Sequence, residues 1–165
     1  MKKLIIILSI SLYINPVYNQ WIQQTSGTTN NLTSINFINE NTGFCVGSGS
    51  TIIKTTNGGN NWIILTSPVQ VNFDYVKMFS PVNVIIGSLG SNLIIKTTDG
   101  GVTFETIIIN IPSYEDKLKI QFVSFVNGFF LTGSSIYKTN NGGTNWSSMY
   151  TSVGNRDIVF IDENN

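Results

Sequence analysis

Short apolar segments alternate with polar turns along the chain after its first nineteen residues. Residues 32–38 place hydrophobic side chains at alternate positions, which is the pattern of a half-buried strand. Residues 43–46 are apolar throughout, and residues 51–56 are rich in isoleucine and threonine, which favour strands. Residues 62–65 follow a turn at Asn57-Gly58, a dipeptide typical of hairpins because both residues tolerate positive φ. The pattern predicts a unit of four short antiparallel strands.

One phrase occurs three times, at residues 54–62, 96–104 and 138–146, with starts that are 42 residues apart. Its copies read KTTNGGNNW, KTTDGGVTF and KTNNGGTNW. A second phrase, INFINEN at residues 35–41, returns as IVFIDEN at residues 158–164. A repeat of about 40 residues with four antiparallel strands is typical of a propeller blade. A solenoid of stacked hairpins is the alternative, although its repeats are usually shorter.

The repeats divide the chain into an N-terminal leader and a partial propeller. We expect a signal peptide at residues 1–19, in which Lys2 and Lys3 precede an apolar run too short for a bilayer span. An uncleaved membrane anchor is the alternative. After signal cleavage we expect no membrane span and a secreted protein, which is extracellular, periplasmic or on the cell surface. The partial propeller at 20–165 is expected to comprise a strand at 20–25, blades at 32–66, 71–108 and 118–150, and the start of a next blade at 156–165.

The number of repeats predicts an open propeller. Residues 20–165 hold about three blades, whereas closed propellers have about 4–8. We therefore expect an all-β, incomplete propeller of four-stranded antiparallel blades that is the N-terminal part of a longer protein. Its exposed edges and apolar blade faces should make the isolated chain associate with copies of itself.

The repeated phrase resembles the Asp-box, the S/T-x-D/N-x-G-x-T-W turn of bacterial neuraminidase repeats (BNR). The surrounding pattern is most similar to secreted β-propellers related to the photosystem II stability and assembly factor, and the resemblance covers residues 20–165. It implies the fold more strongly than a function, because such propellers include hydrolases, receptors and assembly factors. The residues that match the motif are Thr55, Asn57, Gly59 and Trp62, then Thr97, Asp99, Gly101 and Phe104, then Thr139, Asn141, Gly143 and Trp146.

These motif residues include types found in metal and catalytic sites, but their chemistry predicts structural turns. An Asp or Asn side chain can accept hydrogen bonds from backbone N–H groups within its own turn. Glycines supply backbone conformations that are closed to other residues, and the final aromatic ring can pack between neighbouring blades. The spaced carboxylates of a calcium-binding EF-hand loop are missing after Asp99. We therefore expect no catalytic, metal-ligating or cofactor-binding role for them.

Composition excludes several classes of function. The 165 residues include no histidine, a single arginine (Arg156) and a single cysteine (Cys45). His-based catalysis, an internal disulfide and the arginine cluster implied by a sialidase resemblance are therefore excluded. The formal net charge is zero, so we expect no nucleic-acid partner. Cys45 stands in an apolar strand and is expected to be a small buried residue.

Acidic residues in the connections between blades are the remaining candidates for catalysis. A glycosidase needs two carboxylates about 5–10 Å apart, and Asp74, Glu115 and Asp116 could face one rim of the propeller. Tyr75 and Tyr114 lie in the same connections and could serve either binding or packing.

We predict a secreted, non-enzymatic propeller scaffold for protein binding or assembly, with a protein or a glycan as its partner. One alternative is a glycan-processing hydrolase, sialidase-like or xyloglucanase-like, whose active site is completed by blades outside this chain. The other is a module of a cell-surface adhesin.

Overall fold

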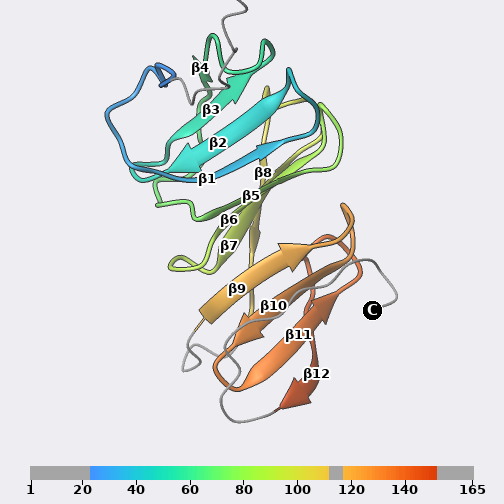
Figure 1. Ribbon diagram of the computed structural model, residues 1–165. Coiled ribbons are helices and arrows are strands. Elements are labelled where there is room, and N and C mark those ends of the chain that lie inside the picture. The colour runs from blue at the N-terminus through green and yellow to red at the C-terminus, as the bar shows by residue number, and fades with distance from the viewer. Residues whose placement is uncertain (1–22, 112–116, 152–165) are drawn as a thin grey trace, which may run out of the picture.

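A computed structural model describes residues 23–111 and 117–151 of the chain (Figure 1). Within these residues, twelve strands form three antiparallel sheets of four strands each. The strands are β1 (Leu32–Phe37), β2 (Gly43–Gly47), β3 (Ile52–Thr55) and β4 (Ile63–Ile64) in the first sheet; β5 (Tyr75–Met78), β6 (Val84–Ser88), β7 (Leu93–Thr97) and β8 (Glu105–Ile108) in the second; and β9 (Lys117–Phe122), β10 (Gly128–Thr132), β11 (Ser135–Thr139) and β12 (Ser147–Thr151) in the third.

Each sheet is a simple meander in which every strand pairs with the next strand along the chain. The three sheets follow one another through the molecule, as Figure 1 shows. Four-stranded antiparallel sheets in series are the blades of a β-propeller, so the predicted all-β propeller fold is confirmed. No fourth sheet closes these blades into a ring within the described residues, and the propeller is open there. The same residues include no helix of the length and hydropathy that a membrane span requires.

The strands of the first repeat lie within one residue of their predicted positions. Trp62, predicted to begin the fourth strand, instead precedes β4 as part of the turn. Of the strand predicted at 20–25, residues 23–25 are described and are not in a strand. The predicted signal peptide at 1–19 and the predicted start of a blade at 156–165 lie outside the described residues.

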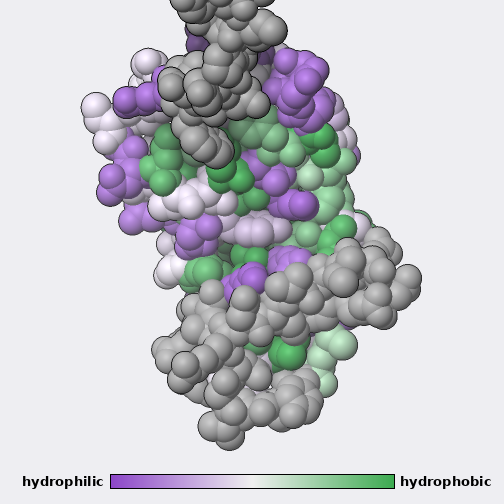
Figure 2. Space-filling view, viewed as in Figure 1, coloured by the Kyte–Doolittle hydropathy of each residue, from purple (hydrophilic) through white to green (hydrophobic). Residues whose placement is uncertain are grey.

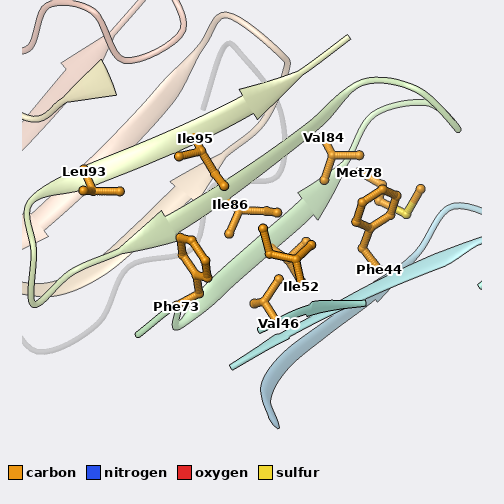
Figure 3. Packing of buried hydrophobic residues seen from close by; sticks show 10 residues of the cluster. Phe44, Val46, Ile52, Phe73, Met78, Val84, Ile86, Leu93 and Ile95 are labelled. Atoms are coloured by element: carbon orange, nitrogen blue, oxygen red, sulfur yellow. The ribbon is translucent and has the colours of Figure 1, made fainter. Parts of the chain in front are cut away.

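Apolar side chains from the first and second blades form one buried cluster. In Figure 3, Phe44, Val46 and Ile52 of the first blade point toward Met78 and Ile86 of the second. Burial of a side chain of this size contributes roughly 1.5–3 kcal/mol, so the cluster is a major source of stability. Its buried members are Phe44, Val46, Ile52, Phe73, Val76, Met78, Val84, Ile86, Leu93 and Ile95.

A second cluster joins the opposite face of the second blade to the third blade. Successive residues of a strand point to opposite faces of its sheet. Ile86 therefore belongs to the first cluster, whereas Ile85 and Ile94 belong to the second. They meet residues of the third blade that include Phe122 and Phe130. The second blade is thus covered by apolar neighbours on both faces.

Polar side chains on the first strands of the first and second blades also bind the next blade. The hydroxyl of Ser34 accepts a hydrogen bond from the N–H of Val76 at 3.2 Å. The phenol oxygen of Tyr75 likewise accepts from the N–H of Phe122 at 3.0 Å. Because β5 and β9 lie at sheet edges, these N–H groups need acceptors from outside their own sheet. Burial raises the pKa of Tyr75 to about 12, so its phenol stays neutral at physiological pH.

The lysine that opens the repeated phrase reaches toward the next blade. The ammonium of Lys54 donates to the carbonyl oxygen of Gly100 at 2.9 Å. The ammonium of Lys96 donates to the carbonyl oxygen of Phe125 at 3.3 Å and lies 4.2 Å from the centroid of the Phe125 ring. The first residue of the phrase therefore links successive blades.

The remainder of the phrase forms a hydrogen-bonded turn between the third and fourth strands, which we call the repeat turn. In the second blade, the hydroxyl of Thr97 donates to Asp99 Oδ1 at 2.7 Å and accepts from the N–H of Gly101 at 2.9 Å. Asp99 Oδ1 accepts in turn from the N–H of Thr103 at 3.0 Å. The same three bonds recur around Asn57 and Asn141. One local network therefore shapes all three turns.

Two glycines are required in each repeat turn. Gly100 and Gly101 have φ angles of +74° and +93°, a region that other residues rarely adopt. A Cβ atom on Gly101 would also collide with Leu65 of the first blade. Glycine at this position therefore permits both the turn and the close approach of the neighbouring blade.

The aromatic residue after each turn lies on the face directed toward the preceding blade. Trp146 makes edge contacts with Phe122 and Phe130, with ring centroids 5.9 Å apart in each pair. Its indole N–H donates to the carbonyl oxygen of Gly143 at 2.9 Å. Trp62 makes an edge contact with Phe37 at 6.0 Å, but the described residues contain no blade that would cover it.

Thr97→Val should destabilise the chain by about 1–3 kcal/mol, because it leaves the buried N–H of Gly101 without its acceptor. Valine has nearly the shape of threonine, so packing is retained at this buried position. Urea denaturation followed by circular dichroism measures the change. Thr98→Val is the matched control, since Thr98 is exposed. Equal denaturation midpoints for the two variants would contradict this account of the turn.

Hydrogen bonds from the side chain and backbone of Thr103, and from Thr97, hold the pKa of Asp99 far below its ordinary value. A carboxylate with a lowered folded-state pKa contributes stability above its ordinary pKa of about 3.9, and loses that contribution as the pH falls through the folded-state value. Asp99→Asn replaces the carboxylate with an amide, whose oxygen can accept the same hydrogen bonds as those of Asn57 and Asn141, and removes the charge. The melting temperature of Asp99→Asn should lie below that of the parent, and this difference should become smaller as the pH falls from 5 to 2. A deficit that stays constant over this range would disprove the electrostatic contribution.

Candidate functional site

The residues of the repeated phrase are engaged in structural contacts. Asn57, Asp99 and Asn141 each accept hydrogen bonds within their own turns, at the exposed end of a blade. Among the described residues, no three His, Cys, Asp or Glu side chains gather closely enough to hold a metal ion. The geometry of these residues is that of a hairpin turn.

Of the three acids expected to face one rim, Asp74 is described, whereas Glu115 and Asp116 lie outside the described residues, as does Tyr114. Both carboxylate oxygens of Asp74 accept from the N–H of Leu89, at 3.3 and 3.0 Å. Burial raises the pKa of Asp74, and the bond from Leu89 opposes that rise. Asp74 is therefore held in a fixed orientation between β5 and β6.

A pocket of about 300 Å³ lies beside Asp74, between the second and third blades. We call it the interblade pocket. Its lining combines the carboxylate of Asp74 with the aliphatic side chains of Leu89 and Ile120. Its lining residues are Asp74, Tyr75 and Leu89 of the second blade and Lys119, Ile120 and Gln121 of β9.

The sequence analysis identified Asp74 and Tyr75 of this pocket as candidates. It did not identify the lining residues that belong to β9. A single lysine and a single glutamine on a strand form no motif, so Lys119 and Gln121 gave no signal. Tyr75 was expected in a connection, whereas the structure makes it the first residue of β5 and a hydrogen-bond acceptor for the third blade.

A second hollow, of about 270 Å³, lies on the face of the first blade that is turned away from the second. We call this surface the first-blade face. Figure 2 shows hydrophobic residues exposed among hydrophilic ones on the visible side of the molecule. Ile35 on this face is 57% exposed, while the free thiol of Cys45 is buried and its pKa is raised by that burial. The lining residues are Gln24, Ser26, Leu32, Ile35, Phe37, Cys45, Ile53, Gly58, Gly59 and Trp62.

Solved structures with the same arrangement of blades support the propeller assignment. A structure described as YCF48 bound to D1 peptide superposes with a TM-score of 0.65 at 24% identity, covering 80% of this chain and 43% of that chain. An ancestral GH74 enzyme superposes with a TM-score of 0.54 at 20% identity, covering 74% of this chain and 19% of the enzyme. At such identities the likeness shows the fold alone.

Sequence comparison identifies the family. The photosystem II stability/assembly factor HCF136 of rice (Oryza sativa subsp. japonica), a chloroplastic protein, is 28% identical over 113 residues. That match covers 64% of this chain and 27% of the rice protein, so the chain spans about a quarter of its relative. The sequence profile described as Photosynthesis system II assembly factor YCF48 matches residues 14–158, which is most of the chain. The chain therefore belongs to the YCF48 family of photosystem II assembly factor propellers.

Proposed function

We propose that this chain is a secreted, non-enzymatic propeller scaffold that binds a protein partner. Family membership supports the proposal, because the family and its rice member are described as assembly factors. A structure described as YCF48 bound to D1 peptide, which has the same fold, supports a peptide segment as the kind of partner. Export is proposed from residues 1–19, where two lysines precede a short apolar run.

The interblade pocket is the observation that carries the proposal, because its walls are held in place before any partner arrives. Hydrogen bonds fix Asp74 to Leu89 and Tyr75 to Phe122. Preorganised walls lower the entropic cost of binding. A peptide segment can therefore enter without reordering the two blades.

The pocket has both polar and apolar lining residues, which suits a peptide because a peptide carries both kinds of group. The carboxylate of Asp74 can accept a hydrogen bond from a peptide N–H. Leu89 and Ile120 provide apolar surface for a side chain of the partner. Mostly apolar walls with a few polar groups that fix orientation are typical of ligand-binding pockets.

A glycan hydrolase is the second candidate, because an ancestral GH74 enzyme has the same fold. Hydrolysis needs a pair of carboxylates about 5–10 Å apart. Asp74 is the carboxylate that lines the interblade pocket within the described residues. Membership of a family described as assembly factors makes the scaffold the better-supported function.

Site-specific photo-crosslinking in the source organism tests the scaffold. In a variant with p-benzoylphenylalanine in place of Gln121, irradiation should crosslink the chain to one discrete protein. The adduct should appear in the exported fraction, and the propeller chain in it should begin near residue 20. The control replaces Ile108, which is 62% exposed on β8, and should give no adduct. Neutralising the pocket with Asp74→Asn should reduce the adduct about tenfold, because hydrogen bonds to charged groups contribute roughly 1.5–3 kcal/mol.

Two results would contradict this proposal. Equal adducts from positions 121 and 108 would mean that the interblade pocket is not the binding surface. Release of reducing sugar from xyloglucan by the purified chain, abolished by Asp74→Asn, would favour the hydrolase instead.

A further inference from the structure

The second blade differs from the first at two positions that shape the interblade pocket. The two blades share one register, in which the lysine that opens the repeated phrase pairs with the second residue of β2 and of β6. In this register Gly87 corresponds to Val46. Asp74 stands directly before the residue that pairs with Gly87, as Thr33 stands before the residue that pairs with Val46.

The glycine leaves the space that the pocket occupies. Val46 is fully buried in the first cluster, where its side chain fills the corresponding space of the first blade. A Cβ atom on Gly87 would lie 3.3 Å from Tyr75 Cβ and 3.5 Å from Ile120 Cγ2, and both of these residues line the pocket. The missing side chain therefore leaves room between the blades, with apolar walls that continue the second cluster.

The aspartate cannot make the contact that its counterpart makes. The hydroxyl of Thr33 donates to the carbonyl oxygen of Phe73 at 2.6 Å, in the connection that leads to the second blade. An ionised carboxylate has no hydrogen to donate, so Asp74 cannot repeat this bond. It accepts instead from the N–H of Leu89, and its side chain is exposed at the pocket.

Within the described residues, Asp74 is the charged group of the pocket that has no partner of opposite charge. A carboxylate has about four lone-pair sites, and one N–H group does not occupy them all. Lys119 also lines the pocket, but it has a partner of its own and forms no ion pair with Asp74. A cation carried by a binding partner would therefore complement this carboxylate.

We infer that the interblade pocket takes the side chain of a lysine from the protein partner, an inference that rests on the proposed scaffold function. The aliphatic stem of the lysine covers Leu89 and Ile120, while its ammonium reaches Asp74. Arginine fits less well, because the N–H of Leu89 lies 3.0 and 3.3 Å from the two carboxylate oxygens and occupies the edge that a guanidinium fork would bind. An ammonium is a compact charge that can use one remaining lone pair.

Fluorescence anisotropy of labelled pentapeptides with the purified chain tests this inference. The peptides consist of glycine and alanine around a central lysine, norleucine, arginine or glutamate, with both ends blocked. Norleucine has the stem of lysine without the ammonium. The lysine peptide should bind at least about tenfold more tightly than the norleucine peptide, because the ammonium adds a hydrogen bond between charged groups. The arginine peptide should bind more weakly than the lysine peptide.

Three variants locate the effect in the pocket. Asp74→Asn should remove the preference for lysine over norleucine. Glu105→Gln is the matched control, because Glu105 is an exposed carboxylate that does not line the pocket, and it should retain the preference. Gly87→Ala should weaken both peptides to a similar degree, because the added Cβ narrows the space beside Tyr75 and Ile120. Circular dichroism checks that each variant is folded.

Equal binding of the lysine and norleucine peptides would overturn the inference, as would tighter binding of the arginine or glutamate peptide. A preference for lysine that survives Asp74→Asn would overturn it too. If any of these results came with an intact crosslink from position 121, the scaffold function would still stand. Loss of that crosslink with the lysine preference retained would instead contradict the scaffold function alone.

Discussion

Burial of apolar sheet faces between neighbouring blades is the interaction on which the rest of this structure depends. A four-stranded sheet with isoleucine on both faces cannot bury both by itself, so each blade needs its neighbours. Ile85 and Ile86 are adjacent on β6, yet they belong to two clusters on opposite sides of the second blade. Repeats of this kind are therefore stable as a series, and an end of the series that lacks a neighbour exposes apolar surface.

The repeated phrase follows from the same constraint. Its lysine reaches forward, as Lys54 does to Gly100. Its second glycine allows the preceding blade to come close, as Gly101 does for Leu65. Its last aromatic residue rests on the face directed backward, as Trp146 does against Phe122. The motif therefore serves the stacking of blades.

Local features of the fold were predictable from the sequence, whereas relations between blades were not. The alternation of residues 32–38 and the turn at Asn57-Gly58 predicted strands and hairpins, because these depend on neighbours along the chain. The contact of Tyr75 with Phe122 was missed, because it depends on which strands adjoin across blades. Trp62 and Trp146 look alike in sequence, but among the described residues only Trp146 has a preceding blade beside it. The interblade pocket could not be predicted for the same reason, because its lining residues come from two different blades.

Amide hydrogen exchange of the purified chain, followed by mass spectrometry, tests most directly whether contacts between blades govern stability. Exchange protection reports local opening, which should be least where both faces of a sheet are covered. Residues 84–88 and 93–97, in β6 and β7, should therefore exchange most slowly. Residues 43–47 and 52–55, in β2 and β3, should exchange faster, because the described part of the chain covers one face of their blade with a neighbouring blade and not the other. Equal protection of these two pairs of strands would contradict the account, since each blade would then be stable without its neighbours.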